Sequence, residues 1–228
     1  MIRASDTLAL QPFDAVIFDM DGTILDTESV FKTIVFDVCT ELGYEMTDAV
    51  HGSMVGSSHE HNSRLLIEAY GVAFPWTLFD ERCRVIMHER TEDGGVPLKQ
   101  GAGEFITELH RRGTPVAVAT SSRYPHAHRH LSAAGLWDLF DTVVTRDDVV
   151  HPKPHPEPYL TAARRLLVDP ARCLAIEDSH VGVRAAHAAG MQTIMVPDLV
   201  PPTAELMALG IAVVESLDHV HGAAFPRA

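Results

Sequence analysis

The sequence predicts an α/β protein whose parallel sheet is interrupted near the start of the chain by a helical segment. Two observations predict this fold. From residue 98 onward, short apolar runs alternate with segments of helical periodicity, which is typical of a parallel sheet covered by helices on both faces. Between the first apolar run, Ala15–Phe18, and this alternating region, residues 27–90 have apolar side chains at helical spacing and little strand signal.

Each element follows from a local pattern. The first strand is the fully apolar run Ala15–Phe18, and Gly113, Gly135 and Gly190 are placed where glycine commonly ends a helix. After the helical segment the expected elements are, in order, a helix over Ala102–Arg111, a strand within 114–122, a helix over 125–134, a strand within 140–145, a helix over 157–167, a strand within 173–179, a helix over 181–189, a strand within 192–198, a helix over 203–209 and a short strand within 211–216.

This order divides the chain into two domains. Residues 1–25 and 98–228 are expected to form the α/β core, and residues 26–97 are expected to form a small all-helical domain inserted after the first strand. A chain of 228 residues is long enough to bury a substantial core.

Composition and charge limit the function. The 31 acidic and 18 basic residues give a net charge of −13, which argues against nucleic acid and against an anionic membrane as partners. No apolar run approaches the roughly 18 residues of a membrane span, and the first residues are too polar for a signal peptide, so a cytoplasmic protein is expected. Cys39, Cys83 and Cys173 are isolated from one another, which predicts reduced and mostly buried thiols.

Polar side chains gather where the predicted strands end. Asp19 and Asp21 follow the first strand, residues 120–122 end the second, and residues 177–179 end another, so all three groups fall at the same edge of the sheet. Lys153 precedes a helix and can reach that edge. Residues i and i+2 of an extended segment point to one side about 6.5 Å apart, and at a dielectric of 20 two carboxylates there repel by roughly 2 to 3 kcal/mol. A shared cation or proton accounts for the pair. The alternatives are a surface turn for the aspartates and a solvated loop position for the lysine.

Four motifs in order resemble one known superfamily. They are DMDGT at 19–23, a threonine at 120 after the second strand, KP at 153–154 before a helix, and EDSHVGVRAAHAAGM at 177–191. Together they resemble the phosphatase branch of the haloacid dehalogenase-like superfamily, over residues 14–199. Within that branch the chain is similar to the beta-phosphoglucomutase-like group, whose members carry a helical cap after the first motif.

The resemblance implies roles for the acidic residues. Asp19 is then the nucleophile that forms an aspartyl-phosphate, and Asp21 is the general acid and base. Mg²⁺ is the implied cofactor, held by the Asp19 and Asp178 side chains and the Asp21 backbone carbonyl. Glu177 is a further metal candidate, and holding Lys153 is its alternative role.

The resemblance also implies the groups that bind phosphate. Thr120, the backbone at Ser121 and Lys153 then hold the phosphoryl oxygens, and Lys153 supplies local positive charge against the net charge of the chain. Gly22 allows the turn after the nucleophile and is a candidate substrate contact.

The cap segment is the implied source of substrate choice. Residues 51–62 are expected to form a loop near the substrate, with His59, Glu60 and Arg64 as candidate contacts or, equally, as ordinary surface residues. Phe31 stands where sugar-phosphate mutases of this group carry a proton-transferring histidine, and His59 stands near an expected arginine. Both departures favour a phosphatase over a mutase.

The expected function is therefore a Mg²⁺-dependent phosphatase of a small phosphorylated metabolite such as a sugar phosphate, acting as a monomer or homodimer. A mutase and a non-catalytic sensor of phosphorylated metabolites are the alternatives. The 14 histidines raise one separate question. His126 and His130 have the spacing of zinc ligands on a helix, but no third ligand is evident in the sequence, so a solvated helix face is expected there.

Overall fold

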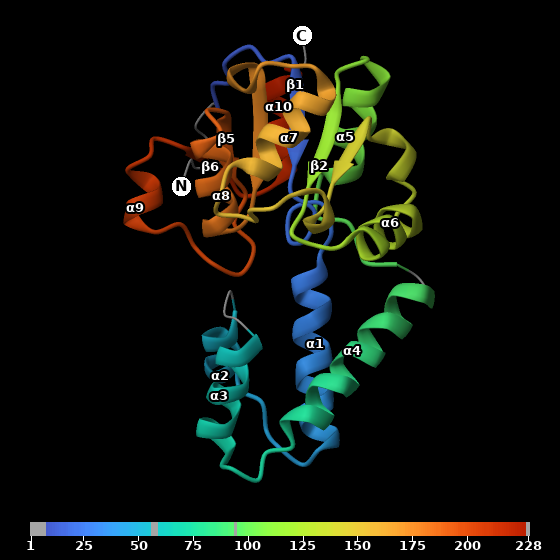
Figure 1. Cartoon of the computed structure of the whole chain (residues 1–228), viewed down its shortest axis with the longest axis vertical. Coiled ribbons are helices and arrows are strands. Elements are labelled where there is room, and N and C mark those ends of the chain that lie inside the picture. The colour runs from blue at the N-terminus through green and yellow to red at the C-terminus, as the bar shows by residue number, and fades with distance from the viewer. Residues whose placement is uncertain (1–7, 56–58, 94, 227–228) are drawn as a thin grey trace. The chain divides into compact units, whose positions relative to one another are not determined.

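The computed structural model describes residues 8–55, 59–93 and 95–226 (Figure 1). The chain divides into two compact units, one made of Met1–Asp26 with Pro97–Ala228 and the other of Thr27–Val96. The first unit holds the sheet, and the second is helical throughout its secondary structure as described.

The sheet of the first unit has six parallel strands. Their spatial order is β3-β2-β1-β4-β5-β6, so the chain adds strands on one side of β1 and then on the other. Ligand sites of open α/β sheets lie at the carboxyl ends of the strands, at such a switch in order. The strands are β1 (Ala15–Phe18), β2 (Val116–Ala119), β3 (Thr142–Val144), β4 (Cys173–Glu177), β5 (Gln192–Met195) and β6 (Ala212–Val213). The predicted α/β fold with a parallel sheet is confirmed.

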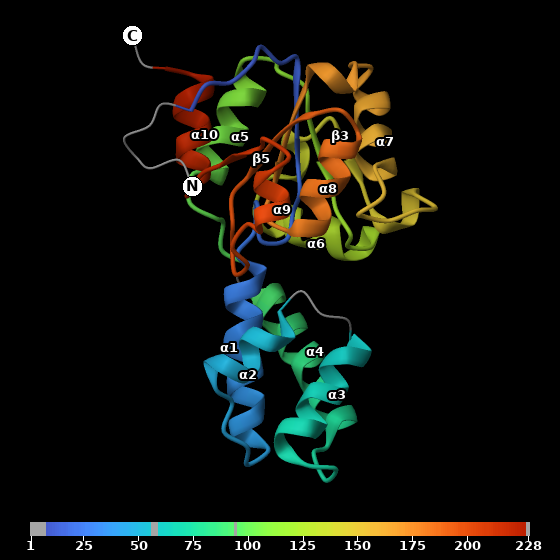
Figure 2. The same cartoon turned by 90° about the vertical axis from the view of Figure 1, so that its left-hand side faces the viewer.

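Helices cover both faces of this sheet. Figure 2 shows α5 and α10 on one face and α7 and α8 on the other. The helices are α5 (Ala102–Arg111), α6 (Tyr124–Ala133), α7 (Glu157–Leu166), α8 (His180–Ala188), α9 (Ala204–Met207) and α10 (Leu217–Ala224), with single 3-10 turns at η1 (Trp137–Leu139), η2 (Arg146–Asp148) and η3 (Pro170–Arg172). The helix α10 was not predicted from the sequence, and its side chains Leu217 and Val220 are fully buried.

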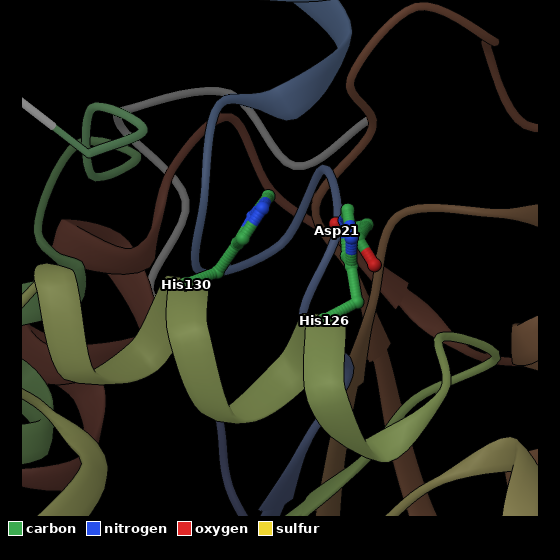
Figure 3. Close-up of side chains that lie close together, drawn as sticks. All are labelled: Asp21, His126 and His130. Carbon is green, nitrogen blue, oxygen red and sulfur yellow. The ribbon is translucent and has the colours of Figure 1, made fainter. Parts of the chain in front are cut away.

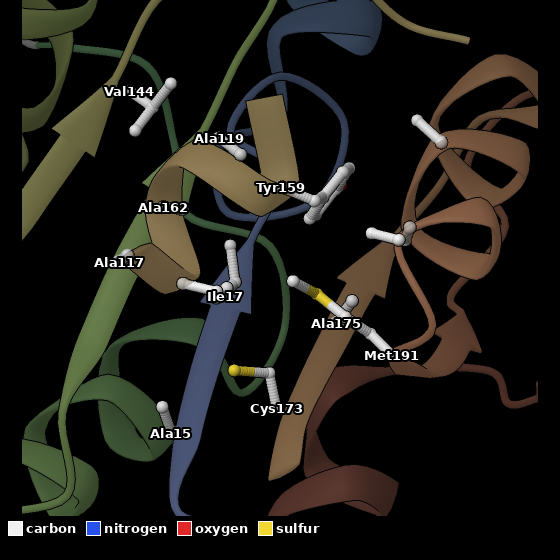
Figure 4. Packing of buried hydrophobic residues seen from close by; sticks show 14 of the residues in the cluster. Ala15, Ile17, Ala117, Ala119, Val144, Tyr159, Ala162, Cys173, Ala175 and Met191 are labelled. Carbon is white, nitrogen blue, oxygen red and sulfur yellow. The ribbon is translucent and has the colours of Figure 1, made fainter. Parts of the chain in front are cut away.

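Small side chains allow the helices to lie close to the sheet. Ala117, Ala119 and Ala175 on the strands and Ala162 on α7 belong to one buried cluster (Figure 4). Tyr159 on α7 is the largest side chain of that cluster and is fully buried. Because the surrounding side chains are short, its ring fits between helix and sheet, and its hydroxyl comes within reach of the end of β4.

The helical unit has a core of its own. Its helices are α1 (Thr27–Glu41), α2 (Asp48–Met54), α3 (His59–Tyr70) and α4 (Trp76–Asp93). Ile34, Val38 and Leu66 are among the side chains buried between them. Arg82 on α4 donates to Glu41 on α1 at 2.9 and 3.1 Å.

The segment at 51–62 is mostly helical. The prediction of a loop over 51–62 is wrong at both ends, because residues 51–54 lie in α2 and residues 59–62 in α3; positions 56–58 lie outside the described residues. Thr47 begins α2 by accepting a hydrogen bond from the Val50 N–H, and Met54 packs into the core of the unit.

The prediction of buried, free thiols is confirmed at all three cysteines. In the part of the chain described here, every helix is too short or too polar to cross a membrane.

Candidate active site

Three acidic side chains meet at the carboxyl edge of the sheet. Asp19 directly follows β1, Glu177 ends β4, and Asp178 follows it. One carboxylate oxygen from each of the three lies within 4.8 Å of the others, and all three residues are buried. The register of the sheet places them together, because Phe18 is paired with Ile176 across β1 and β4. The parallel pairing thus brings distant parts of the sequence to one point.

Lys153 lies in the middle of this acidic cluster. Its Nζ donates to Asp19 Oδ1 and to Glu177 Oε1, each at 2.5 Å, and its side chain is only 3% exposed. A solvated position for this lysine is therefore wrong. Burial alone would lower the pKa of Lys153, but the adjacent carboxylates of Asp19 and Glu177 raise it above its usual value. Lys153 is a fixed positive charge.

The cluster holds three carboxyl groups and one lysine. Burial, opposed by Lys153 and reinforced by Glu177 and Asp21, raises the pKa of Asp19 to about 8. Burial and the charges of Glu177 and Asp19 also raise the pKa of Asp178 well above its usual range. Two buried carboxylates whose ionisation is opposed in this way hold either a proton or a second cation. Carboxylate oxygens are ligands that a hard divalent ion prefers, so this donor set fits such an ion.

Glu177 is fully engaged by neighbouring donors. Its Oε1 accepts hydrogen bonds from Lys153 and from the Tyr159 hydroxyl, at 2.5 and 2.8 Å. Its Oε2 accepts from the Asp178 N–H at 3.1 Å and from both the N–H and the hydroxyl of Ser179, at 3.1 and 2.9 Å. A Cβ at Gly182 would lie 1.7 Å from Oε1, so α8 passes over this carboxylate only because residue 182 has no side chain. These contacts favour a role for Glu177 in holding Lys153.

Asp21 belongs to a second group of contacts at the same edge. Its Oδ2 accepts from the Ser122 hydroxyl at 2.7 Å and from the Thr120 hydroxyl at 3.5 Å. Thr120 Oγ1 in turn accepts from the Ser122 N–H at 2.9 Å. Ser121, between them, is exposed. Ser122 was expected at this edge together with Thr120, but no role was predicted for it.

The backbone turn after Asp21 depends on Gly22. Its φ is +83°, a left-handed conformation that glycine adopts readily. A Cβ at this position would lie 2.3 Å from Asp178 Oδ2 and 3.3 Å from Asp198 Oδ2. Gly22 therefore allows the loop after β1 to approach the carboxylate after β4.

Two further charged residues, Lys99 and Asp198, lie beside the cluster and were not predicted as site residues. Lys99 donates from Nζ to Asp198 Oδ1 at 2.8 Å and lies 3.6 Å from Asp26 Oδ1. Asp198 adds negative charge next to Asp178 and contributes to the raised pKa of that residue. Neither Lys99 nor Asp198 lies in one of the four sequence motifs.

The three candidates of the helical unit are described within that unit alone. His59, Glu60 and Arg64 all lie on α3 and are exposed. His59 Nε2 is 2.9 Å from Asp80 Oδ1, and its ring packs edge-on against Trp76 at 4.9 Å between ring centres.

The fold is that of a haloacid dehalogenase-like hydrolase. The sequence profile described as "Haloacid dehalogenase-like hydrolase" matches residues 16–196, and the chain belongs to this family. The match runs from the first strand to the end of the fifth, so it includes both acidic segments and Lys153. The chain is accordingly a hydrolase of this superfamily, several of whose members similar to it are named as phosphatases.

Two phosphatases and one solved structure are similar to the chain over most of its length. The chain is 33% identical over 183 residues to the fructose-1-phosphate phosphatase YqaB of Escherichia coli, covering 80% of this chain and 95% of that protein. It is 33% identical over 186 residues to the phosphorylated carbohydrates phosphatase of Thermotoga maritima, covering 79% and 83% of the two chains. A crystal structure of a haloacid dehalogenase family hydrolase from Deinococcus radiodurans, with bound phosphate and sodium, superposes with a TM-score of 0.82 at 29% identity, covering 93% of this chain and 95% of that one.

Proposed function

We propose that this chain is a Mg²⁺-dependent phosphatase that hydrolyses a small phosphorylated metabolite, most simply a sugar phosphate, through an aspartyl-phosphate on Asp19. The observation that carries the proposal is the buried Asp19 carboxylate, held through one oxygen by Lys153 and followed two residues later by Asp21. The names of the two relatives described above, which are phosphatases of fructose 1-phosphate and of phosphorylated carbohydrates, support the substrate class.

The reaction follows from the two aspartates. The second oxygen of Asp19, which accepts no hydrogen bond from the described residues, attacks phosphorus as the bond from phosphorus to the leaving oxygen breaks. Asp21 donates its proton to that leaving oxygen, so the alcohol departs neutral. Asp21, now ionised, takes a proton from water as the water attacks the aspartyl-phosphate, and inorganic phosphate and free Asp19 result.

The remaining residues hold the phosphoryl group and the metal. Thr120, the Ser121 backbone N–H and Lys153 bind the phosphoryl oxygens, beside the turn at Gly22. The Asp19 and Asp178 carboxylates and the Asp21 backbone carbonyl would hold Mg²⁺, which supplies positive charge to the transferring group. Glu177 fixes Lys153 through the contacts described above and is not needed as a metal ligand.

Substrate choice is assigned to the helical unit. His59, Glu60 and Arg64 are the candidate contacts to the leaving group, because they are exposed polar side chains of that unit. Substitution of any one of them by alanine is expected to change KM or the order of preference among substrates, with Mg²⁺ dependence retained.

A panel of phosphate esters tests the proposal. Phosphate release is measured with Mg²⁺ and with EDTA, for the wild type and for Asp19→Asn as the matched control. Release that requires both Mg²⁺ and Asp19 supports the proposal, and release equal to the Asp19→Asn background overturns it. Conversion of a hexose 1-phosphate to an isomer without phosphate release would instead identify a mutase.

A further inference from the structure

Two histidines on α6 lie beside the proposed proton donor. His126 and His130 are one helical turn apart, and their ring centres are 3.9 Å from each other. Figure 3 shows both side chains leaving the same face of α6, with the ring of His126 next to Asp21. One ligand atom each from Asp21, His126 and His130 lies within 4.8 Å of the others. The third ligand that the sequence did not reveal is thus supplied by the loop after β1.

His130 is buried without a polar partner. Its residue is 1% exposed, and neither ring nitrogen has a hydrogen-bond partner among the described residues. The expectation of a solvated helix face is therefore wrong for His130, because α6 turns this side chain inward. Buried imidazole nitrogens are normally hydrogen-bonded or bound to a metal, so an unpartnered pair indicates a missing ligand.

The state of the three side chains suits a metal. The His126 and His130 rings each offer a nitrogen within 4.8 Å of the other and of a carboxylate oxygen of Asp21, and neutral imidazole is a common metal ligand. Asp21 Oδ2 accepts the Ser122 and Thr120 hydroxyls, which leaves Oδ1 without a hydrogen bond from the described residues.

We propose that Asp21, His126 and His130 form a binding site for a divalent transition-metal ion of the Zn²⁺ type. Two imidazoles and one carboxylate are a donor set that Zn²⁺ favours and Mg²⁺ does not. Ligands of a tetrahedral ion with bonds of about 2.1 Å are about 3.4 Å apart, so side-chain movements of about 1 Å close the site.

Zn²⁺ bound at this site is expected to inhibit catalysis, and this expectation rests on the proposed function. A Zn²⁺ ion on the Asp21 carboxylate takes the electron pair that would accept the proton from water, and it leaves no proton to donate to the leaving group. The Mg²⁺ site proposed above uses only the backbone carbonyl of Asp21, so the two ions do not compete for one oxygen. Zn²⁺ is thus expected to inhibit in the presence of saturating Mg²⁺.

Direct binding tests the site without reference to activity. Zn²⁺ is titrated calorimetrically into the full chain with Mg²⁺ in excess, on a His151→Gln background, because His151, His155 and Glu157 form an exposed group of the same type. His126→Gln and His130→Gln are expected to weaken Zn²⁺ binding by more than about tenfold, the least that disturbed ligation costs.

The control is a neighbouring histidine on the same helix. His128 is exposed and packs against Tyr124 and Trp137, so His128→Gln removes one histidine of α6 and leaves the site intact. The affinity of His128→Gln for Zn²⁺ is expected to equal that of the His151→Gln background. Histidine ring NMR signals should shift on Zn²⁺ addition for the two site residues and not for His128. Equal Zn²⁺ affinity in all three variants would overturn the proposal, and His126, being half-buried, keeps this test valid if His130→Gln does not fold.

A separate experiment tests whether Zn²⁺ inhibits phosphate release. With an active wild type, Zn²⁺ should suppress phosphate release in the background and in His128→Gln at concentrations that leave His126→Gln unaffected. Histidine-dependent Zn²⁺ binding in a chain that hydrolyses no ester would overturn the proposed phosphatase and leave the metal site standing. Inhibition that is equally strong in His126→Gln would overturn the inhibitory role of the site.

Discussion

Gly182 on α8 tests how the carboxylate of Glu177 is held. In Gly182→Ala the new Cβ would lie 1.7 Å from Oε1, 1.9 Å from Cδ and 2.2 Å from Oε2 of Glu177, so the carboxylate must move. It cannot move freely, because Lys153, Tyr159 and Ser179 all donate to it. Displacement would leave Lys153 buried with one carboxylate partner fewer.

The expected change in the free energy of unfolding of Gly182→Ala is the sum of one favourable and two unfavourable contributions. Alanine gains about 1 kcal/mol over glycine in a helix. Overpacking a core costs about 1 to 3 kcal/mol, and disturbing a buried ion pair costs about 3 kcal/mol or more. A net loss of about 3 to 5 kcal/mol is expected, which lowers Tm by about 6 to 20 °C in a chain of this size.

Gly222→Ala is the matched control. Gly222 is a helical residue on α10, is exposed, and would bring its new Cβ within 4 Å of nothing. The same substitution there is expected to raise Tm by about 2 to 4 °C. Calorimetry of both variants with EDTA measures the difference. Equal or higher stability of Gly182→Ala would show that Glu177 is not held as described.

The remaining predictions concern three other side chains. Tyr159→Phe removes the hydroxyl that donates to Glu177 Oε1 at 2.8 Å and is expected to lower the free energy of unfolding by about 1 to 2 kcal/mol in urea titrations; no change would mean that this bond contributes nothing. Asp21→Asn is expected to lower kcat about 10²- to 10⁴-fold in phosphate-release assays, and full activity would exclude Asp21 as the proton donor. Burial lowers the pKa of His130 to about 4. Between pH 6.5 and pH 4 this histidine therefore binds a proton in the unfolded chain but not in the folded one. The stability of the metal-free wild type relative to His130→Leu should therefore fall, by up to about 3 kcal/mol, between pH 6.5 and pH 4, and parallel pH profiles in thermal melts would contradict this.

The core fold was predictable because its signals are local. Each strand of the sheet is a short apolar run, and the glycines that end helices lie next to the residues they affect. The helix α10 was missed because its segment has only two large apolar side chains, Leu217 and Val220, which are buried in the core. The helical ends of the expected loop at 51–62 were missed because glycine and serine are frequent in that segment.

The sequence by itself determined the α/β class and family, and placed Asp19, Asp21, Thr120 and residues 177–178 at strand ends. It could do so because in a parallel sheet every strand end faces the same edge, whatever the exact packing. Family motifs then give those positions a chemical interpretation, which the experiments above test.

Only the tertiary structure decided which side chains share a contact. Ser122 donates to Asp21 across 101 residues of chain, and Lys153 lies between Asp19 and Glu177, 134 and 24 residues away. Likewise, the face of α6 that is buried depends on packing against the loop after β1, so His130 could be recognised as buried beside Asp21 only in three dimensions. Periodicity determines which residues share a helix face, whereas the partner of that face is set by the fold of the whole unit.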